Sequence, residues 1–169
     1  MKKLITNPKK ISLHDKVEYV FLKKYFLNFI DSDVKKKINY SIFSKTNFEI
    51  NDEIKQSKLN REMHSDILKE LFPYLNKVNK INWQFESWEF FLGKWLHMYI
   101  AIITNRINLV KPLINSEVNY EEQIKIGSDA SLISNDIRDF STKAGLLEWN
   151  EKLLSRIIYI YQTKKFNHT

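Results

Sequence analysis

Two polar side chains occupy positions where the helical pattern of the sequence calls for apolar ones. Successive residues of an α-helix are about 100° apart, which places Arg106 in the centre of an apolar stripe on a helix predicted from Gln84 to Val110. The other members of this stripe are Trp88, Leu92, Trp95, Tyr99, Ile102 and Ile103. Burying an unpaired charge is costly. We therefore expect Arg106 either to form an internal salt bridge or to bind a phosphate or carboxylate group of a ligand.

Asn150 shows the same anomaly on a helix predicted from Leu146 to Gln162. It lies in the middle of a face that also carries Leu146, Leu153, Leu154, Ile157 and Tyr161. A buried amide most often satisfies backbone groups, and the alternative is a role in holding a ligand or in orienting Arg106. Arg106 and Asn150 are therefore the candidate contacts for an anionic group of a substrate.

The histidines show no pattern typical of catalysis or metal binding. Histidine is the usual general base or metal ligand near neutral pH, but His97 is predicted on the helix surface opposite the tryptophans, and His64 at the edge of an apolar face. His14 stands beside Asp15 in a predicted loop and is the remaining acid-base candidate. We predict no metal site and no cofactor, and the sequence leaves the catalytic residues unassigned.

The composition excludes several classes of protein. The chain of 169 residues has no cysteine, which excludes disulfides, thiolate metal sites and a cysteine nucleophile. Its three glycines, Gly93, Gly127 and Gly145, are too far apart to form a phosphate-binding loop. Charged residues interrupt the most apolar stretch, Phe85 to Val110, so we predict no membrane span. Lysines and Pro8 interrupt any signal peptide, and the expected location is the cytoplasm.

The positive net charge raises the question of an anionic partner. There are 27 Lys and Arg residues against 20 Asp and Glu, which gives a formal charge of +7. Neutralisation of phosphates drives nonspecific binding to nucleic acid, but these lysines are spread in small clusters over unrelated segments. Net charge indicates solubility and nonspecific association. The favoured interpretation is a solvated basic surface, and weak nonspecific nucleic-acid binding is an alternative.

Short strands in the first third of the chain must help to position the candidate residues. Brief clusters rich in aromatic and β-branched residues predict strands at Lys2 to Thr6, Val17 to Leu22 and Ile38 to Phe43. The second is nearly continuously apolar, as a central buried strand would be, and the third alternates apolar and polar residues, as a half-buried strand would. A helix from Tyr19 to Phe29 is the alternative for part of this region.

Three long helices are predicted after the strands. The first is capped by Asn51, and Pro73 should kink or divide it. Its predicted apolar face comprises Met63, Ile67, Leu71, Leu75 and Val78. The second helix should end near Pro112, and the third is the helix that carries Asn150. The polar segment from Asn115 to Ser141 is predicted to be rich in loops.

These elements predict one helix-dominated α/β domain over residues 1–162, followed by a polar tail over residues 163–169. The short strands should form a small, parallel sheet at the N-terminus, and the three long helices should follow it. Trp149 flanks Asn150 and is predicted to pack in the interior rather than to stack on a ligand.

The stretch WEFFLGKWLHMYIAIITNRI resembles the most recognisable part of a transferase family found in bacterial gene clusters for O-antigen, lipopolysaccharide and other surface-polysaccharide biosynthesis. That pattern is a tryptophan, a Leu-Gly-x-Trp-Leu core and, about a helix later, an arginine. The matching residues are Trp88, Leu92, Gly93, Trp95, Leu96 and Arg106. Farther along, LLEWNEKLLSRII resembles the Asp-Glu-Trp-Asn segment of the family through Glu148, Trp149 and Asn150.

The beginning of the chain is similar to the same family. LITNPKK followed by VEYVFLKKYF resembles the opening of the family. The chain departs from the family pattern at Lys23, Lys24 and Tyr25, which stand where Gly-Glu-Trp is usual, and at Leu147, which stands where aspartate is usual. Members of the family are several times longer and look like two-lobed glycosyltransferases, so this chain corresponds to the N-terminal portion.

The resemblance implies a short or truncated N-terminal lobe of a surface-polysaccharide transferase that lacks the sugar-nucleotide lobe and is not catalytic alone. Its expected partners are a sugar-nucleotide-binding lobe or partner chain and a carbohydrate acceptor. Arg106 would hold an anionic group, and Asn150 would orient it. The alternative from a different class is a non-enzymatic helical module for protein interaction, which the aromatic-rich helices favour.

Overall fold

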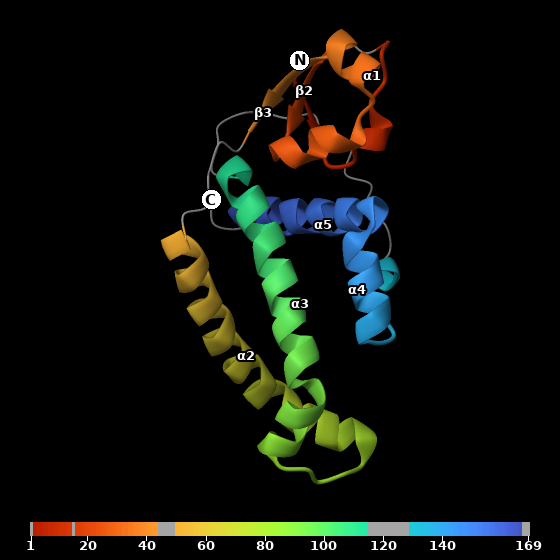
Figure 1. Ribbon diagram of the computed structural model, residues 1–169. Helices are drawn as coiled ribbons and strands as arrows, with labels where there is room; N and C mark the ends of the chain where they lie inside the picture. Colours follow the sequence, from red (N-terminus) through yellow and green to blue (C-terminus); the bar gives the residue numbers. More distant parts are fainter. Residues whose placement is uncertain (1, 15, 44–49, 115–128, 167–169) are drawn as a thin grey trace. The chain divides into compact units, whose positions relative to one another are not determined.

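A computed structural model describes residues 2–14, 16–43, 50–114 and 129–166 (Figure 1). The chain divides into two compact units. Unit 1 comprises Met1–Thr46 together with Arg106–Thr169, and unit 2 comprises Asn47–Asn105. Three short strands precede the long helices, so the predicted helix-dominated α/β fold is confirmed.

Unit 1 contains a three-stranded parallel sheet of order β1-β2-β3. Its strands are β1 (Lys2–Ile5), β2 (Glu18–Phe21) and β3 (Asn39–Ile42). The three predicted strands are thus confirmed, and β2 is central and mostly buried, as expected for a strand between two parallel neighbours. In this register Ile5 pairs with Phe21, and Phe21 pairs with Ile42. The carboxyl ends of the strands therefore lie at one edge.

The segments between the strands are short helices. These are the 3-10 helices η1 (Pro8–Lys10) and η2 (Lys24–Phe29) and the α-helix α1 (Ser32–Lys37). The alternative of a helix from Tyr19 to Phe29 is wrong, because Tyr19 pairs with both neighbouring strands and commits its backbone to the sheet. Phe26 and Leu27 of η2 are buried instead.

The edge strand β3 does not show the predicted alternation. Asn39 and Tyr40 are exposed, whereas Ser41 and Ile42 are half-buried. The ring of Tyr40 nevertheless meets the ring of Phe21 edge to face, with centroids 5.9 Å apart. The first two residues of this strand are therefore more exposed than the last two, and exposure does not alternate between the two faces of the sheet.

The C-terminal part of unit 1 contains two consecutive α-helices, α4 (Ile137–Gly145) and α5 (Leu147–Phe166), after the 3-10 helix η3 (Asp129–Leu132). They meet at a steep angle at Leu146, whose backbone is extended (Figure 1). The predicted helix from Leu146 to Gln162 corresponds to α5, which begins one residue later and continues to Phe166.

Helix α4 lies in the segment that was predicted to be rich in loops, of which residues 115–128 lie outside the described part of the chain. The helix begins at an N-cap, because the side chain of Asp136 accepts a hydrogen bond from the backbone N–H of Asp139 at 2.8 Å. Asp139 also pairs with Lys143 at 2.7 Å, one turn later. The helix is thus polar on its exposed surface, and Phe140 is fully buried.

Helix α5 supplies much of the core of unit 1. Its buried apolar side chains are Trp149, Leu153, Leu154, Ile157 and Ile158. Trp149 meets Phe140 of α4 edge to face at 5.8 Å, which agrees with the predicted packing role of this tryptophan. Apolar residues of the last turns of the preceding long helix, Leu109, Val110 and Leu113, are buried as well.

Unit 2 is a hairpin of α2 (Ile50–Asn79) and the first part of α3 (Phe85–Ile114), which run side by side in Figure 1. The buried residues at its centre are Leu68, Trp88, Leu96 and Ile100. Asn76 fixes the connection, because it exchanges two hydrogen bonds with the backbone of Trp83 and accepts a third from the indole of Trp88 at 2.8 Å.

The predicted apolar faces of these helices are wrong in part. Met63 and Val78 of α2 are exposed, and the buried apolar residue among those described on this helix is Leu68. On α3, Tyr99 is exposed and Trp95 only half-buried, while Leu96 and Ile100 are buried. A helix that packs against one partner helix buries only the part of its apolar stripe that faces the partner. The stripe itself does not show which part that is.

Pro73 does not divide its helix, whereas the second long helix ends at Ile114, close to Pro112, as predicted. Helix α2 is continuous through Pro73. Leu68 and Leu75, which flank Pro73, belong to the same packed cluster, and this shared packing outweighs the one backbone donor that proline removes. Helix α2 begins at Ile50, so the predicted cap Asn51 lies inside its first turn.

Within the described residues, no helix is long and apolar enough to cross a membrane.

Candidate functional site

The two residues that the sequence singled out are in direct contact. The Nε–H of Arg106 donates a hydrogen bond to Oδ1 of Asn150 at 2.7 Å, across 44 positions of the chain. Both side chains are half-buried rather than fully enclosed. This hydrogen bond to a neutral amide orients the guanidinium.

The orientation of Asn150 is set by backbone groups between α4 and α5. Its Nδ2 donates to the carbonyl oxygens of Ala144 and Leu146, each at 2.8 Å. An amide has its two donors on nitrogen, so the oxygen must face Arg106. Both hydrogen-bonding roles considered for Asn150 are therefore observed, since it satisfies backbone carbonyls and orients the arginine.

A second cationic side chain, Lys23, lies within reach of the charge of Arg106. Lys23 follows β2 directly after the buried Leu22. Burial, and then the positive charge of Arg106, lower the pKa of Lys23. Burial also raises the pKa of the Tyr25 phenol, while the charge of Arg106 opposes that rise. Lys23 and Tyr25 thus share the electrostatic environment of the arginine.

These residues gather at the carboxyl edge of the sheet. Asn7 and Lys23 stand at matching positions, each two residues beyond the paired Ile5 and Phe21. The buried Asn7 donates to Oε2 of Glu151 on α5 at 3.0 Å, one position from Asn150. The beginning of α5 therefore docks at this edge. We call Lys23, Tyr25, Arg106 and Asn150 the carboxyl-edge cluster.

Ion pairs reinforce the docking of α5. Lys10 of η1 contacts Oε1 of Glu151 at 2.6 Å, and Lys9 lies 3.8 Å from Glu148. The first of these pairs has a carboxylate that is mostly buried, whereas the second is exposed on both sides and contributes little. Glu148 is therefore a peripheral contact of α5 rather than a member of the cluster.

Lys23 and Tyr25 were not identified as site residues from the sequence, where they stood out only as departures from a family pattern. Their position directly after the most buried strand was the available signal, because ligands of parallel α/β sheets bind at the carboxyl ends of the strands. Because a parallel sheet was predicted, this signal was available from the sequence.

Replacing Lys23 with methionine is expected to stabilise the protein slightly at neutral pH. A lysine whose folded pKa is lowered from 10.5 binds more protons when unfolded. The protonated Lys23 therefore lowers the free energy of unfolding. This loss is fully present below the folded pKa and fades as the pH rises through that value toward 10.5. Solvent screening limits the gain to less than about 1 kcal/mol. Urea denaturation at neutral pH and near pH 10.5 should show the gain shrinking at high pH.

The neighbouring Lys24 provides a matched control, because it is exposed and carries the same formal charge. Lys24→Met should change the free energy of unfolding less than Lys23→Met does. Equal gains from the two substitutions would show that total charge, rather than the proximity of Arg106, is responsible.

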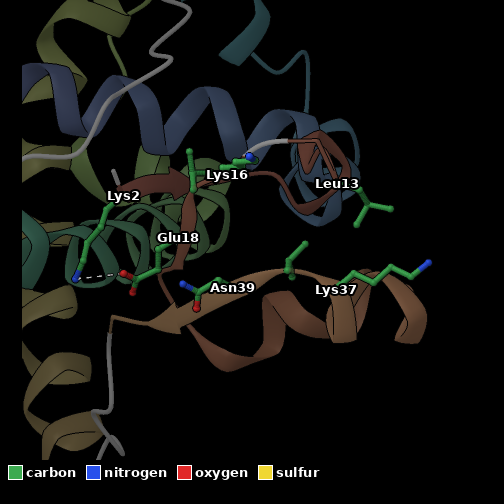
Figure 2. Close-up of a pocket in the computed structure, with 8 residues that line it drawn as sticks. Lys2, Leu13, Lys16, Glu18, Lys37 and Asn39 are labelled. Atoms are coloured by element: carbon green, nitrogen blue, oxygen red, sulfur yellow. Dashed lines mark ion pairs between the residues drawn. The ribbon is translucent and has the colours of Figure 1, made fainter.

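A cavity of about 560 Å³ opens at the opposite, amino edge of the sheet (Figure 2). It is lined in part by Lys2, Lys16, Glu18 and Lys37. Glu18 is engaged by Lys2 at 3.7 Å, and Lys37 extends away from that pair in Figure 2. These ammonium groups do not converge on one point, so we assign the cavity no ligand.

The remaining residues of the recognised motif lie in unit 2 and pack its hairpin. They are Trp88, Leu92, Gly93, Trp95 and Leu96. His64 of α2 contacts the carbonyl oxygen of Gly93 through Nε2 at 3.0 Å, which confirms the prediction of a hydrogen-bonded histidine at the edge of the apolar face. His97 is exposed, as predicted, and its ring lies 6.0 Å from that of His64.

His14, the other histidine candidate, is exposed, and its neighbour Asp15 lies outside the described residues. In the part of the chain that the structure describes, no three His, Asp or Glu side chains are grouped as metal ligands would be. The carboxyl-edge cluster is therefore the candidate functional site.

Substituting alanine for Gly93 is expected to stabilise unit 2. A Cβ there would lie 3.5 Å from Cγ of Glu89 and 3.7 Å from Nε2 of His64, which are ordinary contact distances. Glycine inside a helix costs roughly 0.5–1 kcal/mol relative to alanine, so Gly93→Ala should gain about that amount in urea denaturation. A loss of stability would indicate that the helices need a closer approach at this glycine.

A parallel sheet whose carboxyl edge carries oriented polar and cationic side chains is typical of ligand-binding α/β domains. Comparison with family models gives a more specific result. The model of the LIC12162 family transferases matches residues 2–169, and the chain therefore belongs to this transferase family. The comparisons with curated proteins and with solved structures found no match.

Proposed function

We propose that the chain is the acceptor-side lobe of a transferase that assembles a bacterial surface polysaccharide of the O-antigen type in the cytoplasm. Membership of a transferase family supports the reaction class. The observation that carries the proposal is the guanidinium of Arg106, held by Asn150 at the carboxyl edge of the sheet. This is where parallel α/β folds place their ligands.

In this proposal the residues of the chain bind and orient the acceptor. Arg106 pairs with an anionic group of the acceptor, because a guanidinium offers several N–H donors in a fixed plane. Asn150 accepts a hydrogen bond from the Nε–H of Arg106 and so sets the plane of the guanidinium. The activated sugar is presented by a sugar-nucleotide-binding lobe, located in the same polypeptide or in a partner chain. The acceptor-side lobe alone does not transfer the sugar.

The test is a transfer assay with the chain alone and with its sugar-nucleotide-binding lobe, using labelled nucleotide sugars and a membrane extract as the source of acceptor. Transfer should require both lobes. Arg106→Met should raise the KM for the acceptor, and Arg138→Met, which removes an exposed guanidinium from α4, should leave it unchanged. Transfer by the chain alone, or equal effects of both variants, would contradict the proposal.

One observation favours a second candidate, the helical interaction module. Phe90 and Phe91 on α3 are 84% and 62% exposed, and Phe91 stacks on Trp83 at 4.9 Å. Exposed aromatic clusters often mark protein interaction sites. Phe90→Ser should reduce the amount of partner protein that co-purifies with the chain from a native lysate if this cluster is the contact. Unchanged recovery would exclude it.

A further inference from the structure

We propose that the carboxyl-edge cluster binds a phosphorylated sugar, with Lys23 and Arg106 holding the phosphoryl group and the ring of Tyr25 covering the sugar. This inference rests on the proposed function, because it names the substrate class of the same site. It adds two residues, Lys23 and Tyr25, to the pair that the sequence identified.

The positions of the two cations support a doubly charged ligand. Lys23 extends from the end of the central strand, and Arg106 is fixed by Asn150 on the helix that docks at the same edge through Asn7 and Glu151. A phosphoryl group carries about −1.5 to −2 charges near neutral pH and three strong acceptor oxygens. It can therefore interact with both cations at once, whereas a carboxylate offers a single charge.

The electrostatics of the carboxyl-edge cluster agree with this assignment. Partial burial and the charge of Arg106 both disfavour the protonated form of Lys23. Groups with perturbed pKa values are concentrated at functional sites, because the arrangement that perturbs them serves a ligand or a reaction. A dianion placed between the two cations would offset their repulsion.

Tyr25 provides a supported aromatic surface beside these cations. Its side chain is 42% exposed, and its ring stacks on the buried Phe26 with centroids 4.5 Å apart and planes inclined by 23°. Phe29 meets the same ring edge to face at 6.5 Å. The ring is thus held from behind by the core of unit 1. The C–H face of a pyranose packs well on such a rigid apolar surface.

The experiment is isothermal titration calorimetry of the full chain with four probes: inorganic phosphate, glucose 1-phosphate, glucose and acetate. Glucose 1-phosphate should bind most tightly, phosphate more weakly, and glucose and acetate weakest. Lys23→Met should weaken phosphate binding about tenfold and Arg106→Met by about one to two orders of magnitude, as expected for loss of a charge-assisted contact. Lys24→Met, the exposed neighbour of the same charge, should leave the affinity within about twofold.

Tyr25 is tested by the difference between two probes. Tyr25→Ala should remove the advantage of glucose 1-phosphate over phosphate and leave phosphate binding itself unchanged, whereas Tyr25→Phe should retain the advantage. Circular dichroism would verify that each variant is folded. An advantage that survives in Tyr25→Ala would show that the ring does not contact the sugar and would overturn that part of the inference.

Two results would overturn the anion assignment. Equal losses in Lys23→Met and Lys24→Met would indicate nonspecific attraction to a basic surface, and acetate binding as tight as phosphate binding would indicate a carboxylate site. These outcomes are separate from those of the transfer assay. Specific phosphate binding without any transfer in the presence of the sugar-nucleotide-binding lobe would support this site and contradict the proposed transferase role.

Discussion

Arg106→Met is expected to abolish most of the affinity of the carboxyl-edge cluster for phosphate-bearing ligands while the chain remains folded. A hydrogen bond to a charged group contributes roughly 1.5–3 kcal/mol, so the affinity measured by calorimetry should fall by about one to two orders of magnitude. The free energy of unfolding should change by less than about 1 kcal/mol. Asn150 loses one half-buried donor that water can replace, and Lys23 loses a repulsive neighbour.

Two further variants separate the roles of charge and geometry. Arg106→Lys retains the charge but not the planar group that Asn150 orients, so it should recover only part of the affinity. Arg138→Met on the exposed surface of α4 should have no effect on binding. Destabilisation of Arg106→Met by more than about 3 kcal/mol would instead indicate that the arginine serves mainly to hold the fold together.

Phe140→Ala should cause the largest loss of stability among the substitutions considered, about 3–5 kcal/mol in urea denaturation. The side chain is fully buried and packs edge to face on Trp149. Its helix also supplies the Ala144 carbonyl that fixes the amide of Asn150. The variant should therefore weaken phosphate binding as well, because Arg106 loses its oriented partner.

A substitution at the beginning of the same helix is the control. Ile137 is 39% exposed, so Ile137→Ala should cost less than about 1 kcal/mol and leave phosphate binding intact. If Phe140→Ala is no more destabilising than Ile137→Ala, the contact between α4 and α5 does not support the site as described.

Much of the fold was predictable because local chemistry and tertiary structure agree there. The run from Val17 to Leu22 is apolar throughout, and it forms the buried central strand β2. Arg106 and Asn150 disturbed two apolar patterns, and the structure brings the two side chains into contact. A polar residue in an apolar pattern needs a partner, so two such residues in one small domain are good candidates to meet.

Other features depend on contacts that a helical or strand period does not encode. Helix α4 has a polar composition, and its signals were the cap at Asp136 and the acid-base pair of Asp139 and Lys143. The side of α3 that is buried depends on which residues of α2 it meets, and this favours Leu96 over Trp95. Lys23 becomes a site residue only when the docking of α5 at the carboxyl edge of the sheet brings Arg106 near it.

The most direct test of the central claim is the side-chain 1H–15N NMR spectrum of the full chain during titration with glucose 1-phosphate, with the Nε–H signal of Arg106 assigned from Arg106→Lys. We predict a saturable shift of this signal and of the Asn150 amide protons, whose midpoint moves to an about tenfold higher ligand concentration in Lys23→Met and stays within about twofold in Lys24→Met. Small shifts that do not saturate, or shifts that leave Arg106 and Asn150 unchanged, would contradict the assignment of the carboxyl-edge cluster as a phosphate-binding site.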